Sequence, residues 1–397
     1  MVAILVKKNC KTSLAIVALM LLPVAVRAQE ASPAEAIALE QQGKLAEAAQ
    51  AWQEVTRANP RDGAAFASLG VVLAKGQKYP EAAVAYRKAL ALNPKLPGLQ
   101  LNLGLAEFKQ GHFAAAIDPL KAAVGTESTN SPKQLQARTL LGLSYYGTQR
   151  YAEAVKELEP AAAADPANVE LHQVLAQSCL WAREYECALA EFKQILQTNP
   201  DSAAAHVLSG EALDGLGKTP EAIAEFREAI KASPREPNVH FGLGYLYWKS
   251  HQYDDAKREF QAELAIDPGQ AEALAYLGDI AMKTGDNEAA LALLHKSIQL
   301  KNDIRMAAID LGVILAQQKN YAEAVISLRH AVALDQEEPD AHYRLAHVYQ
   351  EMGKKMESQK EFDTVRELKE KKDRRDEDMV RKMSSSPPAL GAPQPPN

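Results

Sequence analysis

The sequence is poor in the residues that several classes of protein require. Its 397 residues include only 3 cysteines, too few for a disulfide scaffold, and only 6% are aromatic. Basic residues are not in excess, since 45 Lys and Arg stand against 51 Asp and Glu and give a formal net charge of −6. Because phosphate binding needs a face rich in Lys and Arg, this balance argues against nucleic acid as a partner.

Motifs of catalysis are also missing from the sequence. The chain has no Gly-rich phosphate loop, no zinc-ligand spacing and no nucleophile elbow. Repeats account for almost all of the chain after residue 28, so they leave no stretch for a catalytic domain. We therefore expect a protein that is not an enzyme and that binds neither a cofactor nor a metal.

The only long hydrophobic run is at the N-terminus, where it has the pattern of an export signal. Lys7 and Lys8 precede the apolar run 14–26, and a small residue at Ala28 suits cleavage after that position. At about 13 residues, the run is shorter than the roughly 20 of a membrane-spanning helix. We expect residues 1–28 to be a signal peptide and the mature protein to be periplasmic or secreted, or associated with the cell envelope. The alternative is an uncleaved segment that anchors the chain.

The rest of the chain repeats with a period of 34 residues. One column of small residues holds Ala36, Gly70, Gly104, Gly142, Ala176, Gly210, Gly244, Gly278, Gly312 and Ala346. Twelve positions later, a second column holds Ala48, Ala82, Ala116, Ala154, Ala188, Ala222, Ala256, Ala290, Ala324 and Ser358. Small residues at both columns indicate that two helices cross closely there, because a large side chain would overpack the contact.

Three further columns define the hairpin. A bulky column follows in the second helix: Trp52, Tyr86, Leu120, Leu158, Phe192, Phe226, Phe260, Leu294, Leu328 and Phe362. Glycine marks several turns between the two helices: Gly43, Gly111, Gly217, Gly285 and Gly353. Proline, which cannot continue a helix, closes the second helix at Pro60, Pro94, Pro166, Pro200, Pro234 and Pro268.

The 34-residue period, the Leu-Gly pair of the first helix, the alanine and bulky residue of the second and the closing proline resemble the tetratricopeptide repeat (TPR). The resemblance implies an all-α fold, an α-solenoid of about ten TPR helical hairpins that form a right-handed superhelix with a concave groove. We expect this superhelix to span residues 29–370, with the first and last repeats acting as caps. A charged capping helix over residues 371–383 and a disordered Pro-rich tail over 384–397 should follow.

The chain departs from the repeat pattern after the third unit. Four extra residues are inserted there, and they include the capping box Ser131-Pro132-Lys133-Gln134. Four residues make about one helical turn, so we expect the next helix to be extended by one turn.

Four histidines and two cysteines raise the question of a special site. His172, His206, His240 and His342 share one column in different repeats, so we expect them to pack rather than to share a metal. Cys179 and Cys187 lie eight residues apart on facing helices of one hairpin, within reach of a disulfide. Both a disulfide and two buried free thiols are compatible with the sequence.

The resemblance also implies where a partner would bind. In this family, positions 2, 5, 9 and 12 of the first helix line the concave face. Mapped onto this chain, these positions give an apolar path of Leu101, Leu105, Phe108, Leu143 and Tyr146. They also give an aromatic cluster beside acids: Phe241, Tyr245, Trp248, Glu211, Asp214 and Asp279. These side chains either bind a ligand or pack on the neighbouring repeat.

Such a surface suits an extended peptide or an amphipathic helix. Members of the family that bind chaperone tails hold a terminal carboxylate with Lys, Arg and Asn, and this groove lacks that set. The acids instead suggest a ligand that is apolar and carries some positive charge.

We therefore expect a non-enzymatic scaffold outside the cytoplasm that binds a protein or peptide partner in its groove. It would associate with a membrane only through partners or through an uncleaved signal segment. The alternative is an assembly factor for envelope polysaccharide export or for secretion machinery, whose aromatic side chains would stack on sugars.

Overall fold

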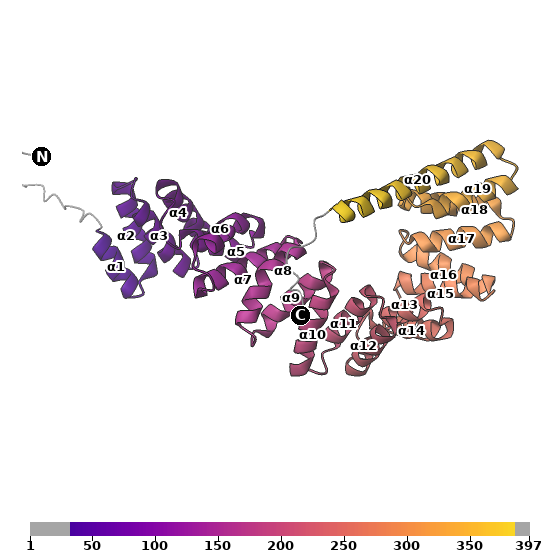
Figure 1. Ribbon diagram of the computed structural model, residues 1–397, viewed down its shortest axis with the longest axis horizontal. Coiled ribbons are helices and arrows are strands. Elements are labelled where there is room, and N and C mark those ends of the chain that lie inside the picture. The colour runs from indigo at the N-terminus through magenta and orange to yellow at the C-terminus, as the bar shows by residue number, and fades with distance from the viewer. Residues whose placement is uncertain (1–31, 386–397) are drawn as a thin grey trace, which may run out of the picture. The chain divides into compact units, whose positions relative to one another are not determined.

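The computed structural model describes residues 32–385, which contain ten pairs of helices and no strands (Figure 1). The first helices are α1 (Pro33–Gln41), α3 (Gly63–Lys75), α5 (Leu99–Lys109), α7 (Pro132–Gly147), α9 (Val169–Trp181), α11 (Ala203–Gly215), α13 (Val239–Lys249), α15 (Ala271–Lys283), α17 (Arg305–Gln317) and α19 (Pro339–Glu351). The second helices are α2 (Leu45–Ala58), α4 (Tyr79–Leu92), α6 (Phe113–Thr126), α8 (Tyr151–Ala164), α10 (Tyr185–Thr198), α12 (Thr219–Ala232), α14 (Tyr253–Ile266), α16 (Asn287–Leu300), α18 (Tyr321–Leu334) and α20 (Lys355–Ser385). The prediction of an all-α fold is confirmed. The expected signal peptide, residues 1–28, lies outside the described residues.

The chain divides into two compact units, Met1–Ser144 (unit 1) and Tyr145–Asn397 (unit 2), and the division falls within α7. Inside each unit, a first helix packs on the second helix of its own hairpin and on the second helix of the hairpin before it. Examples are α3 with α4 and α2 in unit 1, and α13 with α14 and α12 in unit 2. This nearest-neighbour stacking is the packing of an α-solenoid, as predicted.

The two columns of small residues lie at the close crossings, as the sequence predicts. All nine alanines of the second column, from Ala48 to Ala324, are 0% exposed. In the first column, a Cβ added to Gly70 would lie 2.5 Å from the Tyr86 ring, and one added to Gly244 would lie 2.9 Å from the Phe260 ring. The same contact over sixteen residues recurs at Gly104 and Leu120, Gly210 and Phe226, Gly278 and Leu294, and Gly312 and Leu328. The bulky column therefore fills the space that the glycines leave open.

Proline sets the end of the second helix at the predicted places. The C-cap residues of α4 and α14 are Asn93 (φ −146°, ψ 91°) and Asp267 (φ −122°, ψ 93°), each directly before a proline. These angles are extended, as expected for a residue whose helical conformation would clash with the following proline ring.

Each hairpin turns at a residue with positive φ. Five of these residues are the predicted glycines, among them Gly285 with φ +88°. The other five are Gln77, Gln149, Arg183, His251 and Lys319, with φ between 59° and 63°. The tight turn imposes this left-handed conformation whichever residue occupies it, so the non-glycine turns carry backbone strain.

The insertion after the third repeat lengthens α7. This helix has 16 residues, against 13 in α9 and α11. At its start, the Ser131 hydroxyl accepts a hydrogen bond from the Gln134 backbone N–H at 3.1 Å. The Gln134 side chain accepts from the Asn130 N–H at 2.7 Å and donates to the Val124 carbonyl at 3.0 Å. The predicted extension is therefore present, and Gln134 fixes it to the preceding helix.

The last helix is longer than the sequence analysis proposed. Residues 371–383 continue α20 without a break, so the charged segment belongs to the second helix of the last hairpin and is not a separate capping helix. Its basic side chains reach back to the preceding loop, where Lys371 and Arg375 lie 2.5 and 3.3 Å from the Glu337 carboxylate. Of the expected tail, residues 386–397 lie outside the described part of the chain.

The four histidines of one column pair with glutamates of the second helix, nineteen residues later. The distances from His Nδ1 to Glu Oε2 are 2.5 Å for His172 and Glu191, 2.7 Å for His206 and Glu225, 2.7 Å for His240 and Glu259, and 2.6 Å for His342 and Glu361. The sequence predicts that these histidines pack in the hairpin, and it does not indicate that they pair with glutamates. Each pair joins the two helices of its own hairpin.

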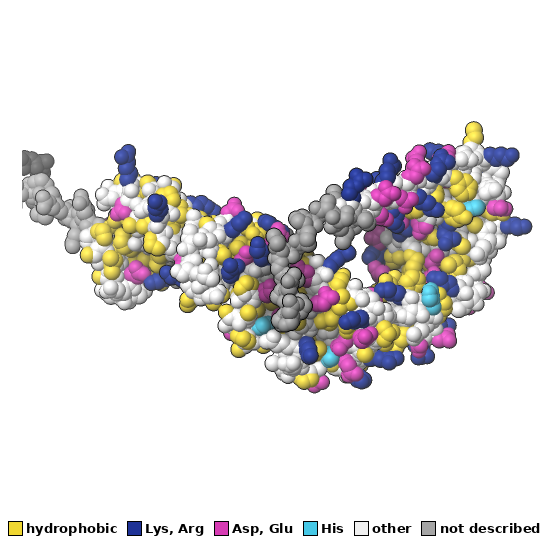
Figure 2. Space-filling model, viewed as in Figure 1, with side chains coloured by type: hydrophobic (Ala, Val, Ile, Leu, Met, Phe, Trp, Pro, Cys, Tyr) yellow, Lys and Arg dark blue, Asp and Glu magenta, His cyan; other side chains and the backbone are white. Residues whose placement is uncertain are grey.

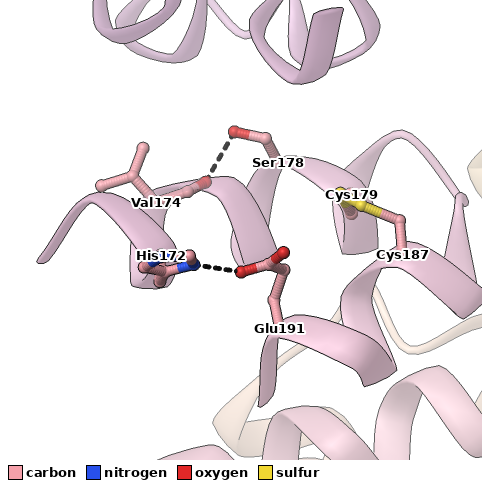
Figure 3. The surroundings of a disulfide bond; sticks show 6 residues. All are labelled: His172, Val174, Ser178, Cys179, Cys187 and Glu191. Carbon is pink, nitrogen blue, oxygen red and sulfur yellow. Dashed lines mark hydrogen bonds and ion pairs between the residues drawn. A yellow bond between two sulfur atoms is a disulfide. The ribbon is translucent and has the colours of Figure 1, made fainter. Parts of the chain in front are cut away.

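A disulfide joins the two helices of one of these hairpins. Cys179 of α9 and Cys187 of α10 are bonded, with 5.8 Å between their Cα atoms. The pair of His172 and Glu191 links the same two helices further from the turn (Figure 3). This hairpin is thus closed by a covalent bond and by a side-chain hydrogen bond.

Within residues 32–385, every helix falls short of the length or apolarity that a membrane span requires.

The strained turns lead to a stability prediction. Lys319 has φ 63°, and replacing it by glycine removes the steric penalty of the left-handed conformation. We expect Lys319→Gly to raise the free energy of unfolding by up to about 1 kcal/mol, reduced by the greater freedom of glycine in the unfolded chain. The matched control is Gly285→Ala, where an added Cβ meets no atom within 4 Å and only the backbone conformation is tested. Denaturant unfolding should show that Gly285→Ala lowers the free energy of unfolding by about 1 kcal/mol. A gain in both variants would contradict the argument.

The histidine pairs lead to a prediction about pH. The Glu225 carboxylate lies at Nδ1 of His206, and the Pro200 carbonyl lies 2.9 Å from Nε2. Because both partners are acceptors, the ring satisfies both only when both nitrogens carry protons. Burial lowers the pKa of His206, but the hydrogen bonds to Glu225 and Pro200 and the charges of Glu225 and Glu228 outweigh it, so the pKa is raised.

A raised pKa means that the stabilisation is fully present below the ordinary histidine pKa and is lost as the pH rises through the folded-state pKa. We expect His206→Gln to lower the free energy of unfolding by about 1–2 kcal/mol at pH 5.5, as for a hydrogen bond to a charged group, and by less at pH 8.5. His295→Gln, an exposed position on α16, is the control. An equal loss for His206→Gln at both pH values would show that the pair does not titrate as argued.

Candidate functional site

A cavity of about 620 Å³ lies between α11 and α13 in unit 2. Its walls are largely apolar and come from three helices: Ala203, Ala204, Val207 and Leu208 of α11, Phe226 of α12, and Val239, Phe241, Gly242, Tyr245 and Leu246 of α13. In Figure 2, hydrophobic side chains show on the inner side of the row α13–α19, with charged side chains around them. The volume is within the range of binding pockets for small ligands or side chains.

One of the α13 residues that line the cavity is a glycine, and this glycine lets the Phe226 ring pack against the helix. Gly242 occupies the column that holds Leu208 one repeat earlier and Tyr276 one repeat later. A Cβ at Gly242 would overlap the Phe226 ring, and one at Gly210 would lie 2.7 Å from the other side of the same ring. Phe226 is therefore held between two glycines and forms a fixed apolar wall of the cavity.

The charged residues that line the cavity are all acidic: Glu211, Asp214 and Glu236. Asp214 is paired with Lys249, whose Nζ lies 2.7 Å from the carboxylate. Withdrawal of water by the surrounding protein raises the pKa of Glu211, although its side chain as a whole is exposed. No Lys, Arg or His is among the described residues that line this space.

A buried carboxylate of the next helix fixes the start of α13. Asn238 is the N-cap of α13, but its backbone is left-handed (φ 68°) and its side chain makes no capping bond. The fully buried Glu263 of α14 replaces that cap, since it accepts from the Asn238 N–H at 2.8 Å and from the Phe241 N–H at 3.1 Å. Negative charge is favoured at a helix N-terminus. Glu263 thereby sets the position of Phe241 and Gly242 in the cavity wall.

Aromatic side chains extend from the cavity toward the next repeat, with Tyr276 of α15 at their centre. Its ring lies 5.8 Å from Phe241, 5.8 Å from Tyr245, 5.0 Å from Trp248 and 5.3 Å from Phe260. Burial, together with the neighbouring Asp279 carboxylate, raises the pKa of Tyr276 to about 12, so its hydroxyl stays protonated at neutral pH. The predicted cluster is therefore larger than the three residues named from the sequence.

Trp248 is fixed by a buried acid rather than left free. Its Nε1 donates to Asp279 at 2.5 Å, and Lys283 lies 2.5 Å from the same carboxylate and 4.8 Å from the centre of the indole ring. Asp279 is 3% exposed. Asp279 thus orients Trp248 and does not offer a surface to a ligand, which corrects its predicted role.

A second buried acid lies near this network. Asp310 of α17 is 6% exposed, and one of its carboxylate oxygens has no hydrogen-bond partner. Burial and the neighbouring charge of Asp279 raise its pKa to about 7, although Lys283 and Arg344 act in the opposite direction. Its carboxyl group is therefore partly protonated at neutral pH.

The apolar path predicted from the sequence is divided between the two units. In unit 1, Leu105 lines a cavity of about 310 Å³, and Phe108 and Leu143 are half-buried. Leu101 is 6% exposed and packs in the interior, so it is not a surface residue. In unit 2, the Tyr146 hydroxyl donates to Gln177 at 2.7 Å.

Besides Glu263, three other residues of the site do not stand out in the sequence. Gly242 and Tyr276 share one column at position 6 of the first helix, and Glu236 lies in the loop before α13. The family's positions 2, 5, 9 and 12 do not include this column. The successive residues in this column are Leu208, Gly242, Tyr276 and Asp310. A single glycine between larger residues was a signal in the sequence, because it leaves space that a side chain would occupy.

Among the residues that the structure describes, no group of three or more His, Cys, Asp or Glu side chains is arranged to hold a metal ion.

The cap supplied by Glu263 can be tested by a single substitution. Glu263→Gln keeps the shape of the side chain but replaces a charged acceptor by a neutral amide, so we expect a loss of about 2 kcal/mol in the free energy of unfolding. Hydrogen exchange at the first turn of α13 should accelerate. Glu288→Gln, an exposed first-turn residue of α16, should change stability by less than about 0.5 kcal/mol. Equal effects of the two substitutions would contradict the capping role.

Comparison with known proteins agrees with the architecture. Models described as "Tetratricopeptide repeat" match residues 34–97, 101–169, 145–209 and 241–303, and a model described as "TPR repeat" matches residues 210–250 and 312–353. Small glutamine-rich tetratricopeptide repeat-containing protein 2 of Mycosarcoma maydis is 36% identical over 100 residues, 25% of this chain and 27% of that protein. Anaphase-promoting complex subunit 3 of Schizosaccharomyces pombe is 25% identical over 125 residues, 32% of this chain and 19% of that protein. The chain thus matches less than a third of the length of these curated relatives.

Among solved structures, a tetratricopeptide repeat protein from Parabacteroides merdae is 19% identical, with a TM-score of 0.49 over 63% of this chain and 97% of that one. YrrB, described as a TPR protein with an unusual peptide-binding site, is 19% identical, with a TM-score of 0.38 over 45% of this chain and 91% of that one. The family matches together span most of residues 34–353, and such repeats indicate a scaffold for interactions between proteins. The chain belongs to the tetratricopeptide repeat family.

Proposed function

We propose that the protein is a non-enzymatic scaffold that acts outside the cytoplasm and holds a segment of a partner protein against the first helices of unit 2. The binding surface in this proposal is the cavity between α11 and α13 together with the adjoining aromatic side chains. The observation that carries the proposal is that these side chains form one apolar surface next to a cavity of about 620 Å³.

The packing of the aromatic residues supports this role. Tyr245 lines the cavity and stacks on Trp248 with 6.0 Å between ring centres and 24° between ring planes. Both rings are held from behind by Tyr276 and by the bond from Trp248 to Asp279. Aromatic side chains that are fixed before binding lose little conformational entropy when a partner docks, so they supply much of the binding energy at such surfaces.

Two features of the chain support a location outside the cytoplasm. The N-terminal segment has the basic and apolar parts of an export signal. The disulfide between Cys179 and Cys187 is compatible with an oxidising compartment, where such bonds persist.

Photo-crosslinking in the native cell tests the proposal. A photoreactive p-benzoylphenylalanine replaces Tyr245 in one variant and Ile326 in a control variant. Ile326 is 69% exposed on α18, a second helix, and lies outside the proposed surface. We expect the Tyr245 variant to crosslink a protein partner within a single peptide segment and the Ile326 variant not to do so. Mass spectrometry identifies the segment, and the mature protein recovered should begin at Gln29.

Two results would contradict the proposal. Crosslinking of the same partners from both positions would show that the surface around Tyr245 is not specific. A third result would support the proposal. When Trp248→Ala is added to the Tyr245 variant, partner crosslinking should be lost while the thermal stability stays unchanged. A protein that keeps residues 1–28 and stays in the cytoplasm would refute the export part alone.

A further inference from the structure

We propose that the cavity between α11 and α13 selects a bulky apolar side chain that is adjacent to a lysine or arginine in the partner segment. This inference rests on the proposed function and adds the chemical class of the segment that binds. It is carried by the apolar walls of the cavity and by the carboxylates at its edge.

The walls favour an apolar occupant. Ala204 and Val207 of α11 face the space on one side, and Phe241 and Tyr245 of α13 face it on the other. The Phe226 ring is fixed in the wall and cannot rotate into the cavity, because it packs closely against Gly210 of α11 and Gly242 of α13. A side chain that enters removes apolar surface from water on both partners, at roughly 25 cal/mol per Å².

The charges at the edge favour a cation beside that apolar side chain. Three carboxylates line the cavity, and Lys249 neutralises only Asp214. Glu211 and Glu236 also line the cavity, and no basic residue is among the described lining residues. Burial raises the pKa of Glu211, and a cation of the partner would offset this cost of holding the carboxylate charged. A lysine or arginine of the partner would supply that charge.

Two other cavities of the described residues differ in charge from the cavity between α11 and α13. The cavity beside Leu105 in unit 1 is lined by Lys75 and Lys109 and by no acid among its described residues. The smaller cavity between α17 and α19 contains both Arg344 and Glu351. The preference for a cation is therefore not shared by every cavity and does not follow from the net charge of the chain.

Peptide selection on the full chain tests the inference. The probe is a phage-displayed library of random linear peptides, selected on the wild-type protein, with affinities of the winners measured by fluorescence anisotropy. We expect the selected peptides to share a Trp, Phe or Leu next to a Lys or Arg. Binding should weaken about tenfold in Glu211→Gln/Glu236→Gln and should fall as salt rises. Glu221→Gln on α12, an exposed acid outside the cavity, is the matched control and should bind as the wild type does.

A second pair of variants tests the apolar part. Ala204→Trp fills the cavity from an exposed wall position and should weaken binding at least about tenfold with an unchanged melting temperature. Ala224→Trp, at an exposed position of α12 outside the cavity, should leave binding unchanged.

The outcomes separate this inference from the proposed function. Selected peptides that need Tyr245 but carry acidic or no charged neighbours, or that ignore the Glu211 and Glu236 substitutions, would overturn the inference and leave the scaffold function standing. Peptides unaffected by Ala204→Trp would also overturn it. Failure to select any peptide whose binding depends on Tyr245 and Trp248 would count against the proposed function itself.

Discussion

The structure depends on one contact that is repeated along the chain, in which a glycine or alanine of the first helix meets a large side chain of the second. At Gly244 and Phe260, as at Gly70 and Tyr86, the distance leaves no room for a Cβ. The contact sets how closely the two helices cross, and that distance sets where each hairpin meets its neighbours. Because each hairpin touches mainly the next one, a change in this crossing distance would displace the hairpins that follow it in the unit.

This constraint explains why so much of the fold was predictable. Packing at the crossing acts on every repeat in the same way, so it leaves a column in the sequence. The small residues, the bulky residue sixteen positions later and the proline after the second helix were each readable for that reason. The turns were readable only where they contain glycine, since the same positive φ at Gln77 or Lys319 leaves no mark in the residue type.

The candidate site was less predictable because it depends on exceptions to the repeat. Family positions pointed to Phe241, Tyr245 and Trp248, and these three side chains all contact the Tyr276 ring. The same positions could not show that Asp279 is buried beneath Trp248 or that Leu101 is an interior residue. Gly242 lines the cavity and Glu263 supplies the cap of α13, and neither residue has an equivalent in the neighbouring repeats. A feature that occurs in only one repeat produces no recurring pattern in the sequence, so it cannot be recognised from the repeats.

The disulfide in the α9 and α10 hairpin has a consequence for how the chain loses its structure. Solenoids fray from their ends, since a terminal hairpin has only one neighbour to hold it. Cys179 and Cys187 close their hairpin near the turn, and His172 with Glu191 joins the same helices further along. Unravelling that advances along unit 2 from the C-terminal end would meet, at this hairpin, two helices that cannot separate at the turn. In an oxidising medium the hairpin would therefore remain as a template on which the hairpins that follow it can re-form.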